Sequence, residues 1–115
     1  MTNDYRSPGK TTLTPDVFLT IARQSALEVE GVYGLARVRG GMKGMHGKVN
    51  EGVRMQVEDN VVFIDLFLEL DNEVNIREVS RKVQLTVARA ITEMTGLEAG
   101  HINVHIEDIH FKPEE

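Results

Sequence analysis

The stretch VVFIDLFLEL (Val61–Leu70) is predicted to form a long β-strand, and the rest of this 115-residue chain is arranged around it. Successive side chains of a strand point to opposite faces of its sheet. One face of this strand is entirely aliphatic, with Val62, Ile64, Leu66, Leu68 and Leu70. The other face is mixed, with Val61, Phe63, Asp65, Phe67 and Glu69. We therefore predict that the aliphatic face lies in the core and that the mixed face is directed away from it.

Other strands are predicted on both sides of this stretch. VRMQV (Val53–Val57) alternates cleanly and forms a hairpin with Val61–Leu70 through a turn at Glu58–Asn60. VYGLARV (Val32–Val38) and HINVHIEDIHF (His101–Phe111) supply two more strands. In the last of these the alternation slips near Asp108, which indicates either a bulge or the end of the strand.

Two amphipathic helices are predicted between the strands. The first has Thr14 as N-cap and Pro15 at its first position, and it runs to about Glu30, before Gly31. Its expected core side consists of Val17, Phe18, Ile21, Ala22, Ser25 and Val29.

The second helix begins after Asn75, with Glu78 in the capping-box position, and ends at Gly96. Its expected core stripe consists of Ile76, Val79, Val83, Val87, Ala90, Ile91 and Met94.

This order of elements predicts an α+β domain with two layers, in which two amphipathic helices pack on one face of a small, mostly antiparallel sheet. We expect a flexible N-terminus over residues 1–12, a single domain over 13–111 and a short tail over 112–115. A glycine-rich loop is expected over residues 39–52.

The composition narrows the class of protein. The chain has no cysteine, which excludes disulfides, thiolate metal sites and a cysteine nucleophile. The N-terminus lacks the apolar segment of a signal peptide, and no apolar run approaches the roughly 18 residues of a membrane span. These features predict a cytoplasmic protein without a membrane span of its own.

The stretch RVRGGMKGMHGKVNEG (Arg37–Gly52) is locally basic in a chain of net charge −5. Its G-x-x-G patterns lie between predicted strands, whereas the phosphate-binding loops that use glycine in this way open or join helices. We interpret the stretch as a connector, and the acidic net charge argues against a dedicated nucleic-acid binder. An anion-binding module for RNA or anionic lipid is the alternative, with the contacts Arg37, Arg39, Lys43 and Lys48.

No constellation typical of a catalytic, cofactor or metal site is found. The three serines lie outside any nucleophile elbow. His101 and His105 are about 13 Å apart along a strand, too far to share an ion. His105 and Glu107 would need a third ligand from elsewhere, and His110 is predicted to point the other way. We expect a non-enzymatic protein with solvated histidines on the outer sheet face.

Three apolar residues are predicted to be exposed. Phe63 and Phe67 lie on the strand face opposite the helices, and Leu85 lies about 180° from the core stripe of the second helix, between Arg81 and Arg89. Such positions predict contacts with a second copy or another protein.

Two stretches resemble the bacterial alkaline shock protein family: LTPDVFLTIARQSALEVEGVYGL, and VFIDLFLELDNEVNIREVSRKVQLTVARAITEMTGLEAGHINVHIEDIHF. The resemblance spans Leu13–Phe111. It implies a non-enzymatic protein of the cell-envelope stress response and homeostasis, acting by self-association or through membrane-anchored partners at the membrane periphery. It brings no catalytic, cofactor or ligand-binding residues. A role as the regulatory partner of a metabolic enzyme is a further alternative for this protein.

Overall fold

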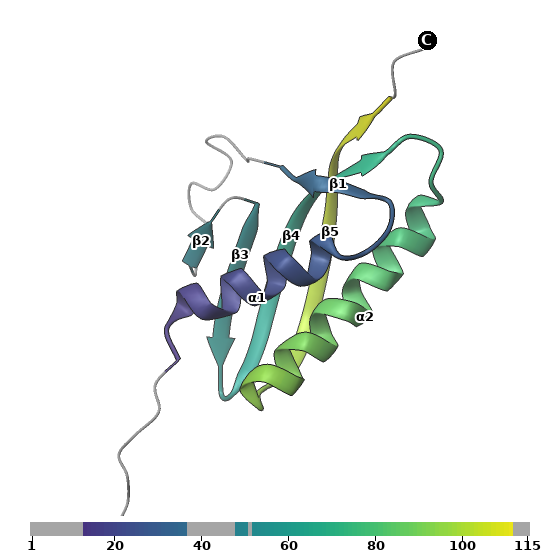
Figure 1. The fold of residues 1–115 in the computed structure, drawn as a ribbon. Coiled ribbons are helices and arrows are strands. Elements are labelled where there is room, and N and C mark those ends of the chain that lie inside the picture. Colours follow the sequence, from purple (N-terminus) through teal and green to yellow (C-terminus); the bar gives the residue numbers. More distant parts are fainter. Residues whose placement is uncertain (1–12, 37–47, 51, 112–115) are drawn as a thin grey trace, which may run out of the picture.

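The computed structural model describes residues 13–36, 48–50 and 52–111, and in them two helices lie on one face of a five-stranded sheet (Figure 1). The predicted two-layer α+β architecture is thus confirmed. The elements in chain order are α1 (Pro15–Leu27), β1 (Val32–Leu35), β2 (Lys48–Asn50), β3 (Val53–Glu58), β4 (Val61–Asp71), α2 (Ile76–Thr95) and β5 (Glu98–His110).

β4 is the central strand of the sheet. Along one edge it pairs in parallel with β5 over its whole length, because α2 crosses over between them. The other edge is shared: β3 pairs antiparallel with Val61–Leu66, and β1 pairs antiparallel with Leu68–Leu70. β2 extends the sheet beyond β3. The sheet is therefore mostly antiparallel, as predicted.

The predicted hairpin between β3 and β4 is confirmed. Asp59 and Asn60 form the turn with φ of 50° and 67°. Two consecutive positive φ angles give a turn whose twist matches that of the flanking strands, and Asp and Asn tolerate this conformation. The register that follows places Met55 opposite Ile64, with both side chains in the core.

β1 and β3 meet end to end beside Phe67. The Phe67 N–H donates to the Gly52 carbonyl at 2.8 Å, and the Phe67 carbonyl accepts from the Ala36 N–H at 2.7 Å. Gly52 has φ of 84°, and a Cβ there would lie 2.5 Å from the Ala36 carbonyl oxygen. Only glycine fits a junction where two chain segments share one strand edge this closely.

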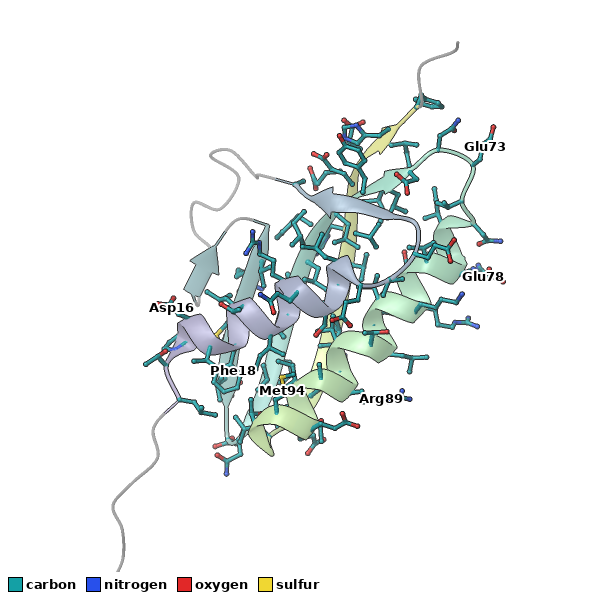
Figure 2. All side chains as sticks on the ribbon, viewed as in Figure 1. Asp16, Phe18, Glu73, Glu78, Arg89 and Met94 are labelled. Carbon is teal, nitrogen blue, oxygen red and sulfur yellow. The ribbon has the colours of Figure 1, made fainter. Side chains whose placement is uncertain are left out.

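α2 follows its predicted signals closely. The Asn75 side chain accepts a hydrogen bond from the Glu78 N–H at 3.0 Å, and Gly96 ends the helix with φ of 78°. Val79, Val83, Val87 and Ile91 are buried. The outer members of the predicted stripe are wrong, since Ile76 is 46% exposed in the first turn and Met94 is 69% exposed in the last. Figure 2 labels Met94 near the C-terminal end of α2.

α1 differs more from its prediction. It ends at Leu27, three residues before the expected end, and Glu28 occupies the C-cap. Leu19 and Ala26 are buried, whereas Val17, expected in the core, is 38% exposed. The physical reason is that α1 packs against both α2 and the sheet, which rotates its buried arc away from the stripe expected for a helix packed on a sheet alone.

The predicted slip in the side-chain alternation of β5 is a bulge. The register passes from Leu68 opposite Ile106 to Glu69 opposite Asp108, so that Glu107 is the extra residue. Ile109 then returns to the core side, opposite Leu70.

The glycine-rich loop was predicted to extend to residue 52. Its last part differs from this prediction, because Lys48–Asn50 forms β2 and pairs with β3.

We expect Gly52→Ala to lower the free energy of unfolding by about 1–3 kcal/mol, because alanine would be strained at this φ and its Cβ would approach the backbone of Ala36. Gly34→Ala in β1 is the matched control, since a Cβ there meets no atom within 4 Å. Urea unfolding of both variants measures the difference. Equal stability of the two variants would contradict the role assigned to the junction.

Candidate functional site: the outer face of the sheet

The sheet face turned away from α1 and α2, called here the outer face, carries most of the polar and aromatic side chains of the strands. Within the described part of the chain, no helix covers it (Figure 1). The register of β3, β4 and β5 brings together Arg54, Phe63, Asp65, Phe67, Glu69, His101, Asn103, His105, Asp108 and His110. The predicted mixed face of β4 is thus confirmed as the face opposite the helices.

Asp65 is the centre of a hydrogen-bonded network at the middle of this face. Its carboxylate accepts from the Arg54 guanidinium in β3, with which it forms an ion pair. The Asn103 amide donates to it from β5 at 3.2 Å, and the His105 ring nitrogen lies 3.2 Å away. Asp65 is only 7% exposed. The Asp65 network (Arg54, Asp65, Asn103 and His105) therefore ties three strands together through one buried carboxylate.

The pKa of Asp65 reflects these partners. Burial by itself would raise the pKa, because it penalises the charged form. The hydrogen bonds from His105 and Asn103 and the adjacent Arg54 guanidinium outweigh burial, and they hold the pKa below its ordinary value of 3.8. Asp65 is therefore a carboxylate at neutral pH, and its charge stabilises the fold.

Each histidine of β5 stacks on an aromatic ring of another strand. His105 lies on Phe67 with ring centroids 4.7 Å apart, and His110 lies on Tyr33 at 3.7 Å. His101 and Phe63 form the loosest pair at 6.0 Å. His101 and His105 are exposed on the outer face, as predicted for solvated histidines, whereas His110 is half-buried. Each of the three also partly covers an aromatic neighbour.

The bulge at Glu107 also overturns the predicted direction of His110. With one extra residue in β5, His110 returns to the outer face, where its Nε2 lies 2.5 Å from Glu69 Oε1. Asp108 stands opposite Glu69 in the same register. A single inserted residue thus assembles the Glu69 cluster (Glu69, Asp108 and His110), which strict alternation could not predict.

The three apolar residues predicted to contact a partner differ in how far they are exposed. Phe67 is only 5% exposed beneath His105, so it does not offer the exposed surface expected of it. Phe63 is half-buried. Leu85 is 60% exposed on α2, as predicted. Of the predicted anion contacts, Arg37, Arg39 and Lys43 lie outside the described residues, and Lys48 belongs to β2.

The edge of β5 is a feature that the sequence analysis missed. In the described residues this 13-residue strand pairs only with β4, so its second edge has no strand partner. The Gln84 side chain donates to the Ile102 carbonyl at 3.0 Å, which satisfies one group of the strand. Beside the start of β5, a groove lined by Leu85, Ala88, Arg89, Thr92, Glu93, Glu98 and Ala99 separates the strand from α2.

Comparison with known proteins identifies relatives over most of the chain. The model of the alkaline shock protein 23 family, described by its cell envelope-related function, matches residues 3–111. The uncharacterised protein YqhY of Bacillus subtilis strain 168 is 35% identical over 109 residues, covering 90% of this chain and 78% of that protein. The uncharacterised protein Spy1535 of Streptococcus pyogenes serotype M6 is 29% identical and covers 95% of this chain and 84% of that protein.

Among solved structures, variants of the MamM C-terminal domain have a similar fold. One superimposes with a TM-score of 0.57 at 14% identity, covering 87% of this chain and 97% of that domain. Another gives a TM-score of 0.52 at 15% identity, covering 83% and 98%. At this identity the likeness concerns the fold alone. In the described residues no helix is both long and apolar enough to cross a membrane.

We expect Asp65→Asn to lower the free energy of unfolding by about 2 kcal/mol at neutral pH, because the charge-assisted bonds of the network are lost. The lowered pKa means that the carboxylate stabilises the protein above the unfolded-state pKa, and that this stabilisation is lost as pH falls through the folded-state pKa. The stabilities of wild type and variant should therefore begin to converge as pH falls below about 4, and should meet only below the folded-state pKa of Asp65. Urea unfolding across pH measures this, with the exposed Glu93→Gln as a charge-matched control. A difference that stays constant with pH would contradict the assignment.

Proposed function

The chain belongs to the alkaline shock protein 23 family, whose function is related to the cell envelope, and on this premise we propose that it is a non-enzymatic interaction domain that self-associates through the free edge of β5. In this role it acts in the envelope stress response and homeostasis, and it reaches the membrane by binding an anchored protein.

The observation that carries this proposal is the length of the β5 edge that has no strand partner among the described residues. A strand edge presents a row of backbone N–H and carbonyl groups, and this makes it a template for pairing with another strand. β5 contributes 13 residues, compared with the five to six of a common strand. Its core-side residues Val104 and Ile106 are only partly buried, which leaves apolar area that a partner would cover.

A second copy of the chain is the occupant that fits this edge. Antiparallel pairing of β5 with β5 across a two-fold axis joins two sheets into one, and it satisfies backbone groups on both chains at once. The two α2 helices then lie on the same face of the joined sheet. Leu85 and the groove between α2 and β5 lie beside that seam, and the groove carries both Arg89 and Glu98, so it offers charges of both signs to an identical surface.

We expect light scattering to give a mass about twice the 12.9 kDa of the chain, and Leu85→Asp to lower it, because the substitution places a charge beside the seam in both copies. Met94→Asp is the matched control: Met94 is 69% exposed on α2, compared with 60% for Leu85, and it points about 180° away, nine residues on at about 100° each. Hydrogen exchange should show protection of residues 98–110 that increases with protein concentration.

A wild type that stays monomeric at high concentration would overturn self-association. A dimer whose β5 amides gain no protection would place the interface elsewhere.

Recruitment to the membrane is tested separately. We expect the protein to co-sediment with native membranes of its source but not with membranes stripped of protein by protease, nor with vesicles of anionic lipid at low salt. Binding to the vesicles that weakens steeply with salt would instead favour the anion-binding alternative.

A further inference from the structure

At the end of the outer face where β1, β4 and β5 run side by side, the Glu69 cluster gathers three side chains of metal-binding type. Each of Glu69, Asp108 and His110 offers one ligand atom, and these atoms all lie within 4.8 Å of one another. Imidazole nitrogens and carboxylate oxygens are both ligands of divalent transition metals.

The register of β5 against β4 brings these three residues together. The bulge at Glu107 places both Asp108 and His110 on the same face as Glu69. Without the extra residue, Asp108 would point to the core side. Bulges are frequent next to functional sites because they redirect side chains in this way.

The ring of His110 is held in place before any ion arrives. Tyr33 stacks on it with an interplanar angle of 13°, and the Nε2 atom is directed at Glu69 Oε1. Tyr33 is itself the bulged residue of β1, where the register shifts between Val32 and Gly34. Ligand orientation by a neighbouring group is typical of protein metal sites.

The ligand atoms, all within 4.8 Å of one another, suit a single ion if the wider pairs close by up to about 1.5 Å. Ligand atoms bound at 2.0–2.2 Å around a tetrahedral ion lie about 3.3 Å apart. The Nε2–Oε1 separation of 2.5 Å needs to open by less than 1 Å, which a small rotation of the Glu69 side chain, 26% exposed, would give. Opposite Glu69 stands Gly34, where even a Cβ would meet no atom within 4 Å, so the space beside the carboxylate is open.

In the neighbouring Asp65 network, an arginine side chain takes the place that a metal ion would need. It has the same pairing of a carboxylate with a histidine, but the Arg54 guanidinium already occupies the Asp65 carboxylate. In the part of the chain that the structure describes, the ion pair found at the Glu69 cluster is the one between Glu69 and His110. The second carboxylate, Asp108, uses one oxygen to accept from the Ile109 N–H at 2.8 Å, which leaves its other oxygen for a ligand.

We propose that Glu69, Asp108 and His110 form a binding site for a divalent transition-metal ion, with Zn²⁺ as the probe that suits the ligand set. The three side chains supply one nitrogen and two carboxylate ligands, and water completes the coordination. Such an ion would link the ends of β4 and β5 at the bulge. The site does not depend on self-association, since all three ligands come from one chain.

Isothermal titration of the purified protein with Zn²⁺ tests the proposal. We expect one ion per chain, and at least a tenfold weaker affinity for His110→Ala and for Asp108→Asn. His101→Ala is the matched control, because it removes another stacked histidine of the same strand that has no carboxylate partner in the described residues. Affinity should fall as pH is lowered, because protons compete for the imidazole nitrogen.

Circular dichroism and urea unfolding establish that the variants fold. NMR spectra of the wild type should show the His110 ring resonances shifting on addition of Zn²⁺, while those of His101 stay in place. Absence of binding to the wild type would overturn the proposal. Unchanged affinity in the folded His110→Ala variant would overturn it equally, because the ion would then be bound at another position.

Discussion

The rest of this structure depends on the pairing of β4 along both of its edges. Its five aliphatic residues, Val62, Ile64, Leu66, Leu68 and Leu70, are completely buried beneath the helices. Burial of each such side chain contributes about 1.5–3 kcal/mol, so this one strand supplies a large part of the hydrophobic stabilisation. The same pairing determines the outer face, because the residues of β1, β3 and β5 on it are positioned by their register with β4.

Asp65 and Glu69, both on the outer face of β4, have different environments. Asp65 lies in the middle of the strand and is buried, so its charge requires the full set of partners from β3 and β5. Glu69 lies nearer the end, where β1 has replaced β3 as the neighbour and presents a glycine instead of an arginine. The first environment stabilises the fold, and the second leaves Glu69 with His110 as its ion-pair partner instead of an arginine.

The edges of the sheet explain why an interaction role suits this fold. On one side, β2 ends the sheet with only three residues. On the other, β5 is long, and within the described residues its outer edge has no strand beside it. The bulge at Glu107 and the hydrogen bond from Gln84 to Ile102 interrupt this edge without covering it. These features protect against indiscriminate pairing and are compatible with one specific partner of matching register.

Much of the fold follows from local sequence signals. The hairpin, the start and end of α2, the buried face of β4 and the existence of a break in β5 were all predictable, because each depends on side-chain periodicity or on a turn or cap a few residues long. What depends on packing between distant elements was not: the rotated buried arc of α1, the burial of Phe67 beneath His105, and the exposed ends of the α2 stripe.

The same distinction between local signals and contacts of distant elements applies to the outer-face sites. The sequence by itself determined that Asp65 and Glu69 share the polar face of a central strand, since alternation alone assigns them to it. Only the tertiary structure decided that Asp108 and His110 join Glu69, because one bulged residue, with no distinctive sequence of its own, reverses the facing of every side chain that follows it. It also decided that Arg54 neutralises Asp65 and that the edge of β5 is left without a partner strand in the described residues, since both depend on which strands become neighbours.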